Sequence, residues 1–302
     1  MGTAPPRAAP VKLVLAFACI YGVWGSTYLA IRLAVDTLPP FLMAGVRFLL
    51  AGAFLYALGA RRGLPRPTRR QWLNATIAGV PLFVVGNGGV TWAEQTVPSG
   101  LAALIVATLP AWLLLLDWAW GGRRGPGLIE VVGIALGLGG VAVLVSPSGT
   151  GGVPVVGTAV LTAAAIAWAA GSLFSRAADL PASAVRTAGM QMLTGGACMV
   201  ALGLALGEAG RSEAAAASWE SVLAFAYLVA AAVVALPAYQ WLLTVCSPAL
   251  VGTYAFVNPA VAVLLGWAVV GEPLSGRTGL AVVLVVAGVA LLTWPRRRES
   301  RH

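Results

Sequence analysis

The sequence is poor in the residues that enzymes use for catalysis. Charged residues make up only 10% of the 302 positions, the only histidine is His302, and the only lysine is Lys12. Membrane hydrolases and acyl transferases need a histidine, paired aspartates or a zinc site within the bilayer. A phosphate-binding loop for ATP needs a lysine directly after its glycines. The sequence therefore predicts neither an enzyme nor a direct user of ATP, and it predicts no cofactor and no metal site.

Cysteine is also scarce. Cys19, Cys198 and Cys246 are the only three, and each falls in or beside a long apolar run. A disulfide framework or a thiolate metal cluster needs cysteines at close, paired spacings. We expect these three to be small packing residues.

Long apolar runs make up most of the chain. Hydrophobic residues account for 59% of it and the mean hydropathy is +0.89, which is too apolar for a soluble protein of this length. Runs of about twenty residues can cross the hydrocarbon core of a bilayer. They occur at 13–33, 39–60, 72–93, 99–120, 127–146, 154–175, 184–207, 219–243, 247–270 and 275–294. The sequence predicts an all-α integral membrane protein with ten transmembrane helices.

The distribution of basic residues indicates how these helices are oriented. Most of the 19 basic residues fall in the two tails and in every second loop, on one side of the predicted membrane. The opposite loops hold only Arg211 and Arg277. Because positive loops stay in the cytoplasm, both termini are predicted to be cytoplasmic. The net charge of +9 then reflects topology and contact with anionic lipids, and no nucleic-acid partner is expected.

An internal repeat divides the chain into halves. A shift of 149 positions aligns Trp92 with Trp241 and Pro110 with Pro259. Since each half would hold five helices, an odd number, the second half must enter the membrane from the opposite side. Inverted repeats are typical of secondary transporters, which bind their solute near the bilayer midplane between the halves. The predicted boundaries are a cytoplasmic tail at 1–12, repeats at 13–146 and 154–294, an external linker at 147–153 and a basic tail at 295–302.

Two arginines lie within the first two apolar runs. Arg32 is near the end of its run, where a long side chain can reach the interface, and we expect it to anchor there. Arg47 lies eight residues after Pro39, roughly 12 Å along the helix axis, which is too deep for that. A charge so placed faces the protein interior or water and needs a partner. Contact with the solute or with a gate is favoured for Arg47 over a structural clamp.

Aromatic and amide residues in the same regions predict a solute cavity. Aromatic rings bury apolar area and attract cations, while amides supply hydrogen bonds. The predicted cavity residues are Trp24, Tyr28, Arg47, Asn87, Trp92, Trp168, Tyr239, Trp241, Tyr254 and Asn258. The matched prolines Pro110 and Pro259 are candidate hinges. Glu94, Asp117 and Glu272 are possible coupling carboxylates, all near helix ends; a facilitator would need none of them.

Several segments together resemble a known family. WGSTYLAIR, PPFLMAGVRFLLAG, VGNGGVTWAEQTVPSGLAALIVATLP and SPALVGTYAFVNPAVAVLLGWAVVGEPLS are similar to the EamA-type branch of the drug/metabolite transporter superfamily, and to its YedA-like inner-membrane exporters. The resemblance covers about residues 13–294. It implies two inverted five-helix repeats and efflux of small metabolites, amino acids or amphiphilic drugs. Arg47 matches the family's arginine in helix two. Gly271-Glu272 matches its Gly-Glu pair, whereas the first half has Gly122-Arg123 instead.

These observations favour a secondary exporter that works by alternating access in a bacterial inner membrane. Its partners would be a small-molecule solute and the lipid bilayer, and both monomer and dimer stay open. A facilitative or import permease of the same fold is one alternative. A non-transporting scaffold or sensor is another, and it would have no solvent-accessible cavity.

Overall fold

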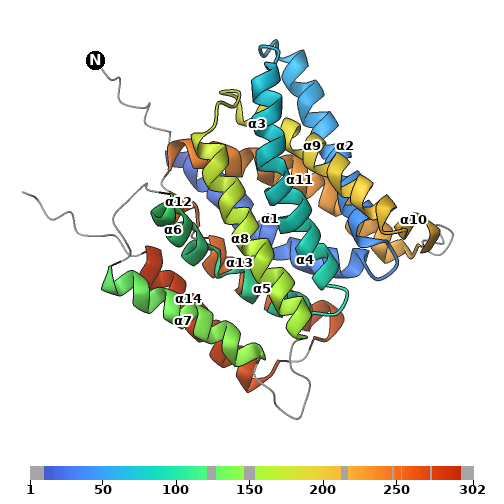
Figure 1. The fold of residues 1–302 in the computed structure, drawn as a ribbon. Coiled ribbons are helices and arrows are strands. Elements are labelled where there is room, and N and C mark those ends of the chain that lie inside the picture. Colours follow the sequence, from blue (N-terminus) through green and yellow to red (C-terminus); the bar gives the residue numbers. More distant parts are fainter. Residues whose placement is uncertain are drawn as a thin grey trace, which may run out of the picture.

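The computed structural model describes residues 10–120, 127–145, 154–211, 217–246, 248–252, 254–272 and 274–293 of the chain. Every regular element in these ranges is a helix (Figure 1). The predicted all-α class is confirmed for this part of the chain. The predicted linker at 147–153, the tail at 295–302 and most of the tail at 1–12 lie outside the described residues.

The helices follow the predicted apolar runs closely. They are α1 (Pro10–Ala34), α2 (Pro40–Arg61), α3 (Arg69–Gly79), η1 (Val80–Asn87), α4 (Gly88–Ala93), α5 (Ser99–Val106), α6 (Leu109–Ala119), α7 (Leu128–Val145), α8 (Val155–Ala177), α9 (Ala184–Ala205), α10 (Glu208–Arg211), α11 (Trp219–Val245), α12 (Pro248–Val251), α13 (Tyr254–Val270) and α14 (Gly276–Thr293).

By length and composition, seven segments of the described chain could cross a membrane. They are Pro10–Ala34, Pro40–Arg61, Arg69–Ala93, Ser99–Ala119, Val155–Ala177, Ala184–Ala205 and Trp219–Val245. Shorter apolar helices at Leu128–Val143, Val257–Val270 and Gly276–Gly288 lie in the remaining predicted runs.

The bundle has two ends. Hydrogen bonds and packing bring the end of α1, the starts of α2 and α5 and the end of α13 together at what we call the distal end. The start of α1 packs beside the end of α11 at the opposite, terminal end, where the Lys12 ammonium lies 4.6 Å from the centroid of a Trp241 ring. The α7–α14 pair and the α2–α9 pair lie at opposite edges of the bundle (Figure 1).

Two of the long segments are irregular in the middle. Between α3 and α4 the chain forms the π-helix η1, which begins just before Pro81. The fourth segment breaks at Ala107 and Thr108, between α5 and α6, directly before Pro110. Because proline lacks an N–H and clashes with the carbonyl four residues earlier, Pro110 accounts for the end of α5. Pro259 instead lies inside the continuous helix α13.

Glycines let α2 and α9 pack with their backbones in contact. A Cβ on Gly52 would lie 2.9 Å from the Leu193 backbone nitrogen and 3.0 Å from the Gly189 carbonyl oxygen. Such close approach is the usual role of small residues between membrane helices.

We expect Gly52→Ala to destabilise the bundle by about 1–3 kcal/mol, since the added methyl group forces two backbones apart. The heated protein in detergent should lose its monodisperse size-exclusion peak at a lower temperature. Gly22→Ala is the matched control, because a Cβ at Gly22 meets no atom within 4 Å. Equal midpoints for the two variants would contradict the packing argument.

Candidate functional site

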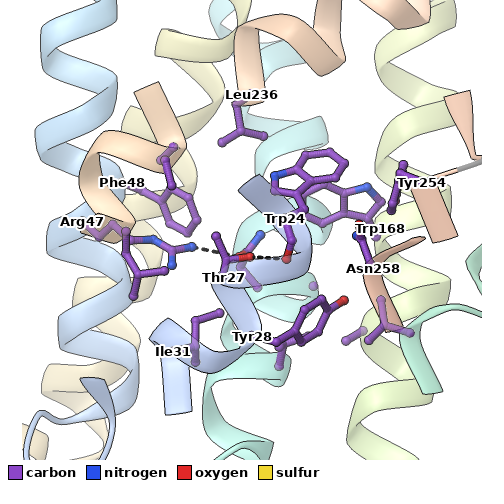
Figure 2. A pocket seen from close by; sticks show the side chains of 18 residues that line it. Trp24, Thr27, Tyr28, Ile31, Arg47, Phe48, Trp168, Leu236, Tyr254 and Asn258 are labelled. Atoms are coloured by element: carbon purple, nitrogen blue, oxygen red, sulfur yellow. Dashed lines mark hydrogen bonds between the residues drawn. The ribbon is translucent and has the colours of Figure 1, made fainter. Parts of the chain in front are cut away.

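A cavity of about 90 Å³ lies within the bundle, and helices from both halves of the sequence line it. Since a buried water needs only about 10–15 Å³, the space admits several waters or a small solute. Its walls are Trp24, Thr27, Tyr28, Ile31, Arg47, Phe48, Gly86, Asn87, Val90, Val106, Ala164, Trp168, Leu228, Ala231, Ala232, Leu236, Tyr254 and Asn258. Figure 2 shows Arg47 and Phe48 on one side and Tyr254 and Asn258 on the other.

Arg47 is the charged residue of this wall, and it is only 4% exposed. Its Nη2 donates a hydrogen bond to Asn87 Oδ1 over 2.9 Å. Its Nε and Nη1 atoms have no partner among the described residues. The guanidinium carbon lies 4.2 Å from the centroid of the Phe48 ring. A guanidinium stays charged and offers five N–H donors, so the cavity holds a cation with free donors.

Asn87 reaches Arg47 because of the π-helix. It is the last residue of η1, and the wider turn of a π-helix shifts the residues that follow around the helix axis. Thr91 Oγ donates to the Asn87 carbonyl oxygen over 2.8 Å, the bond that a threonine hydroxyl commonly makes to the carbonyl four residues earlier in a helix. Isolated π-turns occur often at functional sites.

Asn258 is the second polar group with an unused atom. It is 3% exposed on α13, and its Oδ1 has no hydrogen-bond partner in the described chain. The cavity thus presents free donors on one wall and a free acceptor on the opposite wall. An unpaired buried polar atom costs about 1–3 kcal/mol, so both walls favour a polar occupant.

Aromatic rings close the terminal side of the cavity. The Trp24 ring centroid lies 5.7 Å from that of Trp168, 4.9 Å from Tyr239 and 4.7 Å from Tyr254. The Tyr239 hydroxyl accepts a hydrogen bond from Trp168 Nε1 at 3.2 Å and shares one with Ser172 Oγ at 2.8 Å. Tyr239 is the most deeply buried of these four rings, at 1% exposure, and does not itself line the cavity. We call these four rings the aromatic plug.

Three of the ten expected cavity residues do not line the cavity: Tyr239, which lies behind Trp24 and Trp168, and the two tryptophans Trp92 and Trp241. Trp92 is 36% exposed and lines a surface groove at the distal end with Pro40 and Leu206. Trp241 lies under the Lys12 ammonium at the terminal end. The repeat aligned these two tryptophans, but neither position faces the cavity.

The wall also contains residues that the sequence did not single out. Thr27 and Ile31 complete the face of α1, and Phe48 follows Arg47 on α2. The contribution of α11 consists of Leu228, Ala231, Ala232 and Leu236. These apolar residues carry no signal that separates a cavity wall from ordinary helix packing.

The three candidate carboxylates have different surroundings. Glu94 is fully buried, and neither of its carboxyl oxygens has a hydrogen-bond partner among the described residues. Asp117 is partly exposed on α6 and does not line the cavity. Glu272 accepts hydrogen bonds from the Ser99 backbone at 2.8 Å, from Ser99 Oγ at 2.9 Å and from the Gly100 backbone at 3.3 Å. Glu272 therefore caps the start of α5.

A second glutamate makes the same kind of contact. Glu208 accepts hydrogen bonds from the backbone of Phe41 at 3.3 Å and of Leu42 at 2.8 Å, at the start of α2. Gly207 and Gly271, the residues before the two glutamates, have φ of 74° and 68°, which glycine adopts without strain. Both glutamates stabilise the positive end of a helix dipole.

We expect Glu272→Ala to lower the thermal stability of the protein, because three backbone and hydroxyl donors at the start of α5 lose their acceptor. Hydrogen bonds to charged groups contribute about 1.5–3 kcal/mol. Loss of the size-exclusion peak after heating measures the effect. Glu220→Ala is the control, since Glu220 is an exposed glutamate in the first turn of α11. An unchanged midpoint in Glu272→Ala would show that the cap contributes nothing.

Arg32 also acts at a helix end. It is partly exposed, and its Nη1 donates to the backbone carbonyl of Glu94 over 3.2 Å, just after α4. The cation therefore stabilises the negative end of a helix dipole.

Comparison with known proteins places this geometry in a family. The model of the EamA-like transporter family matches residues 12–146 and again residues 155–294. The chain belongs to the EamA-like transporter family. This confirms the resemblance seen in the sequence, and the protein is a membrane protein of the drug/metabolite transporter superfamily.

Relatives with transporter names support this assignment. The inner membrane transporter YedA of Escherichia coli K12, named as uncharacterized, is 42% identical over 276 residues, 91% of this chain and 88% of that protein. The uncharacterized transporter YvbV of Bacillus subtilis 168 is 25% identical over 95% of this chain and 93% of its own. The similarity to YedA confirms the expected inner-membrane location of this EamA-like protein.

Two further matches concern activity and fold. A protein of Escherichia coli K12 named "Probable amino-acid metabolite efflux pump" is 31% identical over 157 residues, 51% of this chain and 50% of that one. A solved crystal structure superposes with a TM-score of 0.68 at 22% sequence identity, over 94% of this chain and 96% of the other. At that identity the likeness concerns the fold alone.

Proposed function

We propose that this EamA-like protein is a secondary transporter that exports small zwitterionic metabolites of the amino-acid type. The observation that carries the proposal is the pair of unused groups on opposite cavity walls. Arg47 offers Nε and Nη1 as donors, and Asn258 offers Oδ1 as an acceptor. A guanidinium N–H donates a strong, charge-assisted hydrogen bond to a carboxylate, while an ammonium group needs acceptors.

The aromatic walls suit the same class of solute. Trp24, Trp168 and Tyr254 face the space from three helices (Figure 2). Their faces attract an ammonium group and bury the apolar part of a side chain. The efflux pump that is 31% identical over half of this chain carries "amino-acid metabolite" in its name, and this supports the same class. Amphiphilic cationic drugs are the next candidates, but they leave the donors of Arg47 unused.

We propose that transport follows alternating access between two inverted repeats of five helices, with both termini in the cytoplasm. The double match of the family model supports the repeat, and the excess of basic residues in the tails supports the orientation. In this arrangement the aromatic plug closes the cavity on the cytoplasmic side. Pro110, next to the break between α5 and α6, and Pro259, next to Asn258, are proposed as hinges.

The test is uptake by proteoliposomes of a panel of radiolabelled amino acids, together with their N-acetyl and carboxamide derivatives. A transporter that binds both the carboxylate and the ammonium group takes up the free amino acid and rejects both derivatives. Acceptance of the carboxamide would remove the proposed role of Arg47, and acceptance of the N-acetyl form would remove that of Asn258. Cationic drugs in the same panel test the second class.

Empty liposomes measure the background flux. A comparison of right-side-out with inside-out vesicles gives the direction of transport. Flux that requires a solute gradient in either direction would favour the facilitative permease, and flux only toward the cytoplasm would favour the importer. No flux of any member of the panel would overturn the proposed substrate class and would favour the scaffold or sensor.

A further inference from the structure

Glu94 is a buried acid that the proposed solute contacts leave unused. Its exposure is 0%, and neither Oε1 nor Oε2 has a partner in the described chain. Glu94 directly follows the last residue of α4. Its backbone nitrogen donates a hydrogen bond to the carbonyl oxygen of Val90, a residue of the cavity wall, over 3.0 Å. Glu94 itself does not line the cavity; its backbone lies one turn beyond Val90 of the wall, toward the distal end and away from the aromatic plug.

Charged groups surround Glu94 without pairing with it. Arg32 of α1, Arg47 of α2 and Glu272 after α13 interact with it electrostatically, and Tyr28 of α1 is a further titratable neighbour. Each charged neighbour makes its hydrogen bonds to groups other than the Glu94 carboxylate. Arg32 donates to the backbone carbonyl of Glu94, Arg47 donates to Asn87, and Glu272 caps α5.

An ionised carboxylate in this position would accept no hydrogen bond from the described residues and would be stabilised only by the nearby charges of Arg32 and Arg47. Isolated buried charges are so costly that the group takes up a proton instead, or finds a partner. Burial of Glu94 and the nearby Glu272 carboxylate favour the neutral form of Glu94 and outweigh the opposing charges of Arg32 and Arg47.

We propose that Glu94 binds a proton and that this proton frees Arg47 to hold the carboxylate of the solute. The inference rests on the proposed transport function. When Glu94 is neutral, the open donors of Arg47 are available. When Glu94 is ionised, its charge attracts the guanidinium and repels a second carboxylate beside it. Proton and solute therefore bind together, and a solute that leaves down its concentration gradient takes a proton with it.

Infrared spectroscopy of the purified full-length protein tests the proton site without any solute. We expect the wild type at neutral pH to show the C=O stretch of a protonated carboxyl group. This band should disappear in Glu94→Gln and persist in Glu220→Gln. Should Glu94→Gln fail to fold, Glu94→Asp keeps the acid and should shift the band rather than delete it. A wild type without the band, or an unaltered band in either Glu94 variant, overturns the proposal.

Transport provides the second measurement. Proteoliposomes take up radiolabelled L-leucine, L-threonine or L-phenylalanine at a series of external pH values. With one coupled proton, wild-type affinity should weaken by up to about tenfold per pH unit as pH rises. Glu94→Gln, which imitates the protonated acid, should keep the high affinity at every pH, whereas Glu220→Gln should follow the wild type. An unchanged pH dependence in Glu94→Gln contradicts the linkage.

The two measurements separate the two proposals. If none of the three amino acids is transported but the infrared band behaves as expected, the proposed substrate class fails and the proton site stands. If transport occurs but the band is absent, the transporter stands and Glu94 does not carry a proton.

Discussion

Arg47→Ala is expected to reduce amino-acid uptake by about 100-fold or more. The guanidinium supplies two free donors to the cavity, and a charged hydrogen bond contributes about 1.5–3 kcal/mol. A tenfold loss of affinity corresponds to about 1.4 kcal/mol. Loss of the hydrogen bonds from both donors therefore weakens binding by at least two factors of ten. The measurement is the initial rate of uptake into proteoliposomes over a range of solute concentrations, so that KM and maximal rate are separated.

Two further substitutions separate recognition from folding. Arg47→Lys keeps the charge but loses the planar fork, so we expect an intermediate loss of about tenfold. Arg47→Met keeps the length and packing without charge; because an apolar replacement of a buried charge is often neutral in stability, it should fold and fail to transport. Wild-type uptake by Arg47→Met would assign Arg47 to a structural clamp instead.

The positions of the helices could be predicted because the signal is strong. An apolar run of membrane-spanning length has to form a helix, since the backbone has no other hydrogen-bonding partners in lipid. The irregularities were not predicted. The π-helix that ends at Asn87 depends on how the turn after Pro81 packs against neighbouring helices. Tertiary packing of this kind cannot be inferred from the local sequence. Pro110 carried a hint of a break, whereas Pro259 lies in a continuous helix.

The site was only partly accessible to sequence reasoning. Trp24 and Tyr28 share a helix face by their spacing, and both reach the cavity. Trp92 was predicted to line the cavity as an aromatic residue, but it lies in a surface groove at the distal end. The importance of Asn258 depends on its unused oxygen, which only the packed structure reveals.

Trp24→Ala is expected to make the protein leaky. Trp24 is partly buried and touches the other three rings of the aromatic plug, and replacing it by alanine removes up to about 3–5 kcal/mol of packing. Alternating access requires that one side is closed whenever the other is open. With the central ring gone, a distal-open conformation would connect both sides of the membrane.

Loss of preloaded radiolabelled L-threonine from proteoliposomes into solute-free buffer measures this leak. We expect the rate in Trp24→Ala to exceed that of the wild type by about tenfold, which corresponds to only about 1.4 kcal/mol of weakened closure. Trp24→Phe keeps an aromatic ring in the plug and should leak much less. A variant that retains solute as the wild type does would show that the remaining rings of the plug seal the cavity without Trp24. Tyr239, which is held by its bonds to Ser172 and Trp168, would be the next residue to replace.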